Sequence, residues 1–186
     1  MARAGQSISN PVSGERVQYW QTSADTGGAL LEWVHSLDAG RRVPADHVHW
    51  AQEERFQVVS GTATVRVGGE TRTLRSGDVI VIPAGMAHGL RNDGVDQLHV
   101  LTELRPAMRT EHYFETVFGL AHDGKVDKHG LPGLLRGSVI ARGLGEETGV
   151  VGVPAGLSRV LTAVLALVGR ILGYRATYPR YTDRNS

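Results

Sequence analysis

Two stretches of this 186-residue chain decide its fold. Residues Gly40–Gly61 read GRRVPADHVHWAQEERFQVVSG, and residues Gly77–Asn92 read GDVIVIPAGMAHGLRN. Both place short β-branched or aromatic runs between turn-forming Gly, Pro and Asp residues, which is typical of short strands joined by tight turns. His47 and His49 are two residues apart, and in a strand such residues point to the same face. Both imidazoles can therefore reach a single metal ion.

Two more side chains complete a candidate metal site. Glu54 follows His49 after four intervening residues, enough for a bend that returns its carboxylate to the same side. His88 lies in the second stretch, after the Pro83–Gly85 turn. Three imidazoles and one carboxylate suit Fe(II), Mn(II), Ni(II), Cu(II) or Zn(II), and are too rich in nitrogen for Ca(II) or Mg(II). Taken singly, each residue also has a structural explanation, as a packed or surface histidine or as part of a solvated charged patch.

The spacing of these residues resembles the two-motif signature of the cupin superfamily. The family's first motif runs Gly, about five residues, His-x-His, three or four residues, Glu, six residues and Gly. The first stretch follows it, with six residues after Gly40 instead of five. The second motif runs Gly, five residues, Pro-x-Gly, two residues, His, three residues and Asn, and the second stretch matches it at every anchor.

The resemblance implies that one divalent transition metal is held by four side chains: His47, His49, Glu54 and His88. Glu53 also satisfies the looser spacing, but Glu54 alone has six residues between itself and Gly61. Asn92, which ends the second motif, has a structural role in this family more often than a catalytic one. Four protein ligands on a six-coordinate ion leave two adjacent positions for water, substrate or O₂, as a catalytic metal requires.

The segments around the motifs extend the β pattern over residues 15–105, which are expected to form the barrel. Six strands are expected, at Leu30–Leu37, Phe56–Ser60, Thr62–Val67, Glu70–Leu74, Val79–Ile82 and Gln97–Leu104. Gly68-Gly69 is a two-residue hairpin signal, and the apolar run Val79–Ile82 is of the buried-strand type. Short strands with turns at this spacing favour a sandwich or barrel over βαβ units. With the resemblance, they predict a mainly β fold: a cupin jelly-roll β-barrel with a C-terminal α-helical extension.

Alternation along the strands predicts which side chains line the barrel lumen: Trp33, His35, Phe56, Val58, Met86, His99 and Leu101. A lumen of this kind holds one small ligand. His35 and His99 are the spare histidines of the barrel strands, and each is a candidate general base. A histidine satisfied by core or rim contacts is the more common case.

A C-terminal helical extension is expected over residues 106–186, and residues 1–14 are expected to form an N-terminal arm. Glu111–Gly119 has apolar residues at helical spacing, with Gly119 as its C-terminal cap. A second short helix is expected after Pro132.

The last helix is predicted from an apolar stripe of period three to four between Leu157 and Leu172. Arg159 and Arg170 leave ten residues between charges, where a membrane span needs roughly 20 apolar residues. We expect this helix to dock on the barrel or on a second subunit, so a homodimer is predicted. A helix lying in a membrane surface is disfavoured because the polar face has few Lys or Arg residues.

The composition excludes several classes of function. The chain has no cysteine, so disulfides, thiolate metal sites and cysteine nucleophiles are excluded. The formal net charge of +1 gives no electrostatic argument for nucleic acid or for an anionic membrane as a partner. The first residues lack the apolar stretch of a signal peptide, so a cytoplasmic protein is expected.

Because a fold does not fix a function, several activities stay open at this point. The resemblance covers oxygenases, isomerases, cyclases and ligand sensors. The complete ligand set favours a metal-dependent enzyme that acts on a small aromatic or carbonyl-containing molecule, with dioxygenase chemistry slightly preferred. The alternatives are a Lewis-acid isomerase or cyclase and a non-catalytic small-molecule sensor.

Overall fold

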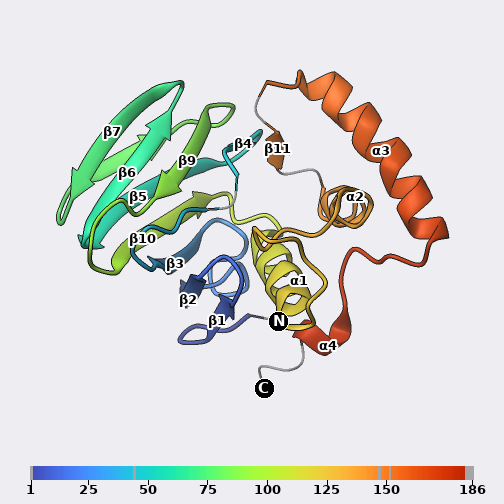
Figure 1. Cartoon of the computed structure of the whole chain (residues 1–186), viewed down its shortest axis with the longest axis horizontal. Helices are drawn as coiled ribbons and strands as arrows, with labels where there is room; N and C mark the ends of the chain where they lie inside the picture. The colour runs from blue at the N-terminus through green and yellow to red at the C-terminus, as the bar shows by residue number, and fades with distance from the viewer. Residues whose placement is uncertain (1, 44, 146–147, 151, 183–186) are drawn as a thin grey trace.

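A computed structural model describes residues 2–43, 45–145, 148–150 and 152–182. Within these residues, two antiparallel sheets face each other, and the helices gather on one side of them (Figure 1). The strands are β1 (Ser7–Asn10), β2 (Glu15–Gln21), β3 (Leu31–Leu37), β4 (His47–His49), β5 (Glu53–Ser60), β6 (Thr62–Val67), β7 (Glu70–Arg75), β8 (Val79–Ile82), β9 (Ala87–Arg91), β10 (Leu98–Arg105) and β11 (Thr148–Val150). The helices are α1 (Thr110–His122), α2 (Leu134–Gly143), α3 (Ala155–Ile171) and α4 (Pro179–Thr182).

The two sheets have the strand orders β1-β2-β3-β10-β5-β8 and β11-β4-β9-β6-β7. The predicted jelly-roll barrel with C-terminal helices is therefore confirmed. Gly68 and Gly69 join β6 to β7 with positive φ angles of 58° and 93°, the conformation that a two-residue hairpin turn needs. β1 pairs with β2, so the chain joins the sheet before residue 15. The division of the chain at residues 14 and 105 stays a prediction.

The strand Val79–Ile82 differs from the sequence-based expectation. Val79 and Val81 are 46% and 48% exposed, whereas Ile80 and Ile82 are buried. The expectation of a fully buried strand is wrong because only one face of β8 packs on the core, and the other face is in solvent. An unbroken apolar run does not distinguish this case from a strand covered on both faces.

The prediction of the lumen residues is wrong for strand β10. Val100 and Thr102 are fully buried, whereas His99 and Leu101 lie on the other face and are partly exposed. Alternation defines two faces but does not say which is inside, and a shift of one residue exchanges them. Met86, also placed in the lumen, is 38% exposed.

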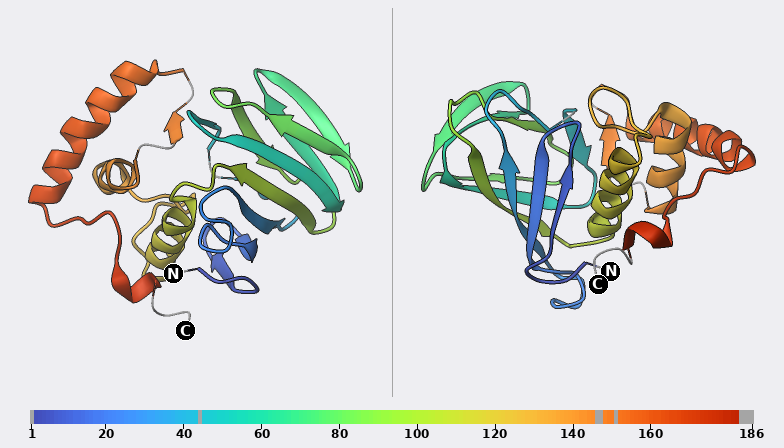
Figure 2. Two further views of the ribbon diagram at one scale, coloured as in Figure 1. Left: turned by 180° about the vertical axis from the view of Figure 1, so that it is seen from behind. Right: turned by 60° about the horizontal axis from the view of Figure 1, so that its bottom comes forward.

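The apolar core has two parts. One fills the barrel between the sheets and includes Phe56, Val58 and Val100. The other lies between the sheet and α1, where Trp33 meets Phe114 edge-on with ring centroids 5.5 Å apart. Helix α1 therefore covers one side of the barrel with its apolar face (Figure 2).

Helix α1 continues beyond its predicted end. It runs to His122, and Gly119 lies inside it, so the prediction of Gly119 as the C-terminal cap is wrong. A Cβ at Gly119 would lie 2.3 Å from the Cγ of Tyr181. The glycine serves the close packing of α4 against α1, a contact that no local pattern reveals.

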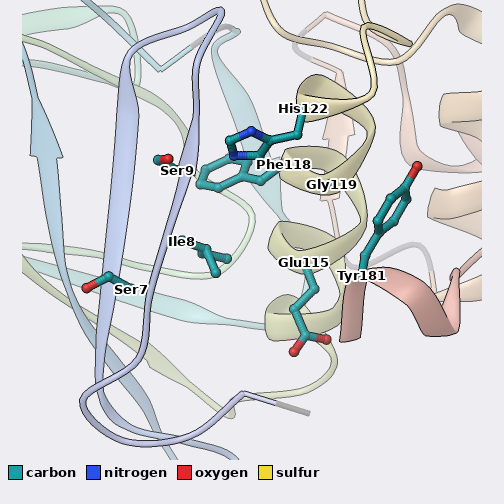
Figure 3. A pocket seen from close by; sticks show the side chains of 8 residues that line it. All are labelled: Ser7, Ile8, Ser9, Glu115, Phe118, Gly119, His122 and Tyr181. Atoms are coloured by element: carbon teal, nitrogen blue, oxygen red, sulfur yellow. The ribbon is translucent and has the colours of Figure 1, made fainter. Parts of the chain in front are cut away.

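A small pocket of about 170 Å³ lies beside this contact (Figure 3). Residues Ser7–Ser9 of β1 line one side, and Glu115 and Phe118 of α1 face them. The pocket shares no residue with the candidate metal ligands.

Helix α3 packs along α2 and approaches the sheets at β11 (Figure 1). Gly169 marks the contact, because a Cβ there would lie 2.6 Å from Cγ2 of Val139. The predicted helix is thus confirmed, while contact with a second subunit stays a prediction. No helix among the described residues combines the length and the apolar character that crossing a bilayer requires.

Candidate metal centre

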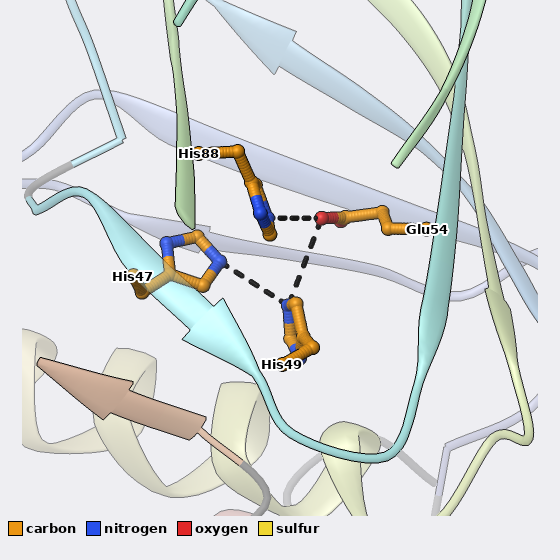
Figure 4. Close-up of side chains that lie close together, drawn as sticks. All are labelled: His47, His49, Glu54 and His88. Atoms are coloured by element: carbon orange, nitrogen blue, oxygen red, sulfur yellow. Dashed lines mark hydrogen bonds and ion pairs between the residues drawn. The ribbon is translucent and has the colours of Figure 1, made fainter. Parts of the chain in front are cut away.

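Three neighbouring strands bring the four predicted ligands together. His47 and His49 lie on β4, Glu54 near the start of β5, and His88 on β9 (Figure 4). β4 and β9 pair with His47 directly opposite His88. The turn after β4 brings Glu54 to the same point from the opposite sheet. The structure therefore unites residues that lie up to 41 positions apart in the chain.

The ligand atoms are close enough to share one ion. One candidate ligand atom from each residue can be chosen so that all four lie within 4.8 Å of one another. Nε2 of His47 lies 3.2 Å from Nε2 of His49, and Oε2 of Glu54 lies 2.6 Å from Nε2 of His88. Two ligands at right angles on an ion with bonds of about 2.1 Å are about 3 Å apart, so these separations suit a transition metal.

Backbone and side-chain carbonyl groups orient all three imidazoles. Nδ1 of His47 lies 3.1 Å from the carbonyl of Ala45, and Nδ1 of His88 lies 2.9 Å from the carbonyl of Met86. Carbonyl oxygens accept hydrogen bonds, so each of these Nδ1 atoms carries a proton, which leaves Nε2 as the nitrogen that can bind a metal. Metal-binding histidines characteristically have such a partner on the other ring nitrogen.

Gln52 orients the imidazole of His49 by accepting a hydrogen bond from its Nδ1. Its amide nitrogen donates to the carbonyls of Pro106 and Ala107 at 2.9 and 3.3 Å. These two acceptors fix the orientation of the amide, so Oε1 must face His49, whose Nδ1 lies 3.0 Å away. Nδ1 of His49 therefore donates, and its Nε2 is free to bind a metal. Gln52 is 1% exposed.

Sequence reasoning missed Gln52. It lies between the two parts of the first motif, in the bend from β4 to β5, and has no periodic position. The one local indication is a polar residue three positions after His49. Its partners are more than 50 residues away, on the segment that leads into α1.

Burial and mutual contacts set the protonation states of the four residues. Burial lowers the pKa of His47 to about 3, and the charges of His49 and His88 act in the same direction. Burial also lowers the pKa of His49. Both imidazoles are therefore neutral, the form that binds a metal.

His88 and Glu54 influence each other. Burial alone lowers the pKa of His88, but the contact with Glu54 outweighs it and raises this pKa above 6.5. Burial alone raises the pKa of Glu54, yet the contact with His88 and the charges of the other histidines lower it to about 2. The contact of Nε2 of His88 with Glu54 thus favours a proton on this nitrogen next to the buried carboxylate, and a metal cation would replace that proton.

The two candidate general bases have their polar contacts elsewhere. Nε2 of His35 lies 3.3 Å from Oε1 of Glu15, and both side chains are buried. Nδ1 of His99 lies 2.9 Å from the hydroxyl of Ser36, on the outer face of the sheet. These are contacts of structural histidines, and a catalytic role for either one stays a prediction.

Asn92 has the contacts of a structural residue. Its amide nitrogen donates to the carbonyls of Leu37 and Asp96, and its side-chain oxygen accepts from the backbone of Gly94. The side chain is fully buried. It ties the end of the second motif to β3 and to the loop before β10.

Antiparallel sheets that enclose a buried cluster of three histidines and one glutamate define a class of metal-binding β-barrel. Comparison with known proteins agrees with this class. The family described as Cupin domain (Cupin_2) matches residues 33–102. An uncharacterized protein of Streptomyces coelicolor is 40% identical over 73 residues, which cover 39% of this chain and 67% of that protein. The chain belongs to the cupin superfamily.

Solved structures with a similar fold include cupins of several bacteria. An RmlC-like cupin from Shewanella frigidimarina is 21% identical, with a TM-score of 0.49 over 56% of this chain and 86% of that chain. A predicted oxalate decarboxylase from Thermotoga maritima is 22% identical, with a TM-score of 0.49 over 57% of this chain and 98% of that chain. Likeness at this level decides nothing about chemistry.

Proposed function

We propose that this protein is a metal-dependent enzyme that acts on a small organic molecule, with oxygenation as the favoured reaction. One divalent transition metal would be held by four side chains: His47, His49, Glu54 and His88. One observation supports this above the others: the Nε2 atoms and a carboxylate oxygen converge, while each Nδ1 faces a carbonyl oxygen.

The residues present fit such an ion. With every Nδ1 acting as donor, the Nε2 lone pairs of His47 and His49 face each other at 3.2 Å. Two lone pairs at this distance repel each other, and His47 and His49 would be relieved of this repulsion if both bound one cation. The single carboxylate of Glu54 leaves a bound divalent ion with a net positive charge, which favours an anionic or enolic oxygen as a further ligand.

The surroundings favour a small and largely apolar substrate. Phe56 lies beside the cluster, with its ring centroid 6.3 Å from that of His88. Three of the four cluster residues, His49, Glu54 and His88, are buried, and low exposure to water strengthens the electrostatic contacts among them. Bound at this site, an iron(II) ion would supply O₂ chemistry, and zinc(II) would supply Lewis-acid chemistry. A six-coordinate ion held by these four side chains would have room for two exogenous ligands, and this expectation favours the oxygenase over the isomerase.

The test is to find which metal supports turnover. Protein purified without oxygen is loaded with Fe(II), Mn(II), Ni(II), Cu(II) or Zn(II) and offered a library of small aromatic and dicarbonyl compounds. An oxygenase consumes O₂ with Fe(II) and not with Zn(II). Turnover of a compound under strict anaerobiosis with Zn(II) would indicate an isomerase or cyclase instead. A compound that raises the melting temperature and stays unchanged would indicate a sensor.

A further inference from the structure

Strand β4 is short, although it carries two of the four candidate ligands. His47 and His49 are its first and last residues, with Val48 between them. On one side it pairs with β9 through two residue pairs, His47 with His88 and Val48 with Ala87. A ladder of two pairs constrains a strand little, whereas a metal site needs its ligands placed within about 0.5 Å. The position of β4 therefore depends on what lies along its other side.

The other side of β4 is covered by β11, a strand of the C-terminal extension (Figure 1). Its three residues pair antiparallel with the three residues of β4: Thr148 with His49, Gly149 with Val48 and Val150 with His47. β11 is the last strand of its sheet, so without it β4 would be the edge. It lies outside residues 33–102, the part of the chain that matches the family.

The backbone groups of β4 face its two neighbours alternately. The carbonyl of His49 accepts a hydrogen bond of 2.8 Å from the backbone of Gly85, which precedes β9. Successive residues of an antiparallel strand turn their N–H and C=O groups to opposite sides, so those of Val48 face β11. β9 thus holds the two ligand residues, and β11 holds the residue between them, opposite Gly149.

Close packing at Gly149 fits β11 to this position. A Cβ on Gly149 would lie 2.6 Å from Cζ2 and Nε1 of Trp50, the residue that follows His49. An added methyl group therefore fits only if the strand or the indole moves. The imidazole of His47 depends most on the position of the strand, because its Nδ1 partner is the carbonyl of Ala45, two residues earlier. Such a local contact orients the ring relative to β4 but does not fix β4 itself.

We propose that β11 belongs to the metal centre and that Gly149 is a positioning residue, which raises the affinity for the ion by holding β4 in place. This inference rests on the proposed function, because it requires an ion bound by His47 and His49. By thermodynamic linkage, the factor by which β11 pairing strengthens metal binding equals the factor by which the bound metal strengthens the pairing. The C-terminal extension thus acts on the site through the backbone of β4.

Titration of the full chain with Zn(II) against a chelating dye tests this proposal. Gly149→Pro removes the backbone donor that faces Val48 and should lower the zinc affinity by at least about tenfold. Gly169→Ala is the control, because it loosens the extension at α2, away from β11, and should leave the affinity unchanged. Melting temperatures of both variants separate lost positioning from lost stability. Equal zinc affinities of Gly149→Pro and wild type overturn the proposal, and so does an equal loss in Gly169→Ala.

A double-mutant cycle with Trp50 tests the same contact without a proline. Gly149→Ala should lower the zinc affinity by about threefold, because its methyl group meets the indole. In a Trp50→Ala background the same substitution should have almost no effect, because the indole is gone. An equal loss in both backgrounds would overturn the role of Gly149.

Hydrogen exchange measures the linkage without any substitution. Zinc loading of the wild-type protein should slow exchange at the amides of Val48 and Gly149 by about tenfold, the factor expected for the proline variant. Exchange in β7, the opposite edge of the same sheet, should not change. Unchanged exchange at Gly149 overturns this inference and leaves the metal site intact. A wild-type chain that binds no zinc would instead refute the metal site, and this inference with it.

Discussion

The barrel interior buries ionisable side chains, whereas helix α3 exposes large aliphatic ones, and both are unusual in a folded protein. Around β4, β5 and β9, three residues that can carry charge are 2% to 6% exposed: His49, Glu54 and His88. On α3, large aliphatic side chains are 42% to 78% exposed. Buried charge and exposed apolar surface both cost free energy in an isolated chain.

The difference lies in what the protein itself supplies. In the barrel, each imidazole has a carbonyl partner, and the ligand atoms face a common centre. On α3, side chains are sorted by size: Gly169 faces α2, and large aliphatic side chains face outward. The preorganised site fits a small cation, whereas the large aliphatic side chains of α3 stay exposed.

The largest expected effect is the loss of metal affinity when a ligand histidine, and not a structural histidine, is replaced. His88→Ala should lower the affinity for a divalent transition metal by at least about a hundredfold, because it removes a ligand from a four-residue set. Elemental analysis after dialysis should find close to one metal ion per wild-type chain and almost none in the variant. His99→Ala is the control, since His99 contacts Ser36, and it should retain the metal. Wild-type protein that takes up no metal on reconstitution would refute the site.

Substitution of Gln52 tests whether the imidazole orientation matters. Gln52→Leu removes the acceptor of His49 Nδ1 and the donor to two backbone carbonyls. We expect metal affinity to fall by about 10- to 100-fold, measured by competition with a chelating dye. Gln97→Leu, at an exposed glutamine that donates to Asp38, should leave the affinity unchanged. Equal affinity in both variants would mean that the barrel alone orients His49.

The same substitution, Gly to Ala, at two positions of α3 tests how closely this helix packs on α2. Gly169→Ala places a Cβ within 2.8 Å of the backbone of α2 and should destabilise the protein by about 1–2 kcal/mol. Gly156→Ala, near the start of the same helix, meets no atom within 4 Å and should stabilise it by about 0.5–1 kcal/mol. Thermal melts followed by circular dichroism measure both. Changes of the same sign would show that the α2–α3 contact is looser than described.

The smallest expected effect is a change in melting temperature when the contact of Asp123, at the end of α1, with Arg180 and Tyr181 of α4 is removed. Hydrogen bonds from Lys125 and Tyr181, with the charge of Arg180, lower the pKa of Asp123 to about 2. A lowered folded-state pKa means that this stabilisation is present above 3.8 and is lost as the pH falls through about 2. Asp123→Asn should therefore lower the melting temperature slightly at pH 7 and by less near pH 2. A difference that grows in acid would contradict this account.

Local sequence predicted most of the strands and helices, and the errors share a cause. The extent of α1, the exposed face of β8 and the orientation of β10 each depend on what packs against the element. Gly119 is a clear case, because its position near a helix end indicates a cap, whereas Tyr181 from the far end of the chain requires its missing side chain. Contacts between distant segments leave no periodic trace in a single sequence.

For the candidate site, the sequence by itself determined which residues meet. The spacing of His47 and His49 assigns both to one face of a strand, and the two motifs identify Glu54 and His88. Only the tertiary structure decided which nitrogen of each imidazole points inward. This depends on carbonyl groups placed by the surrounding fold and on Gln52, whose amide is oriented by the segment that leads into α1. The same holds for α3. The sequence predicts its apolar stripe, but not the side to which the stripe faces. The close contact of Gly169 with α2 decides this, because only small side chains fit on the side of α3 that faces α2.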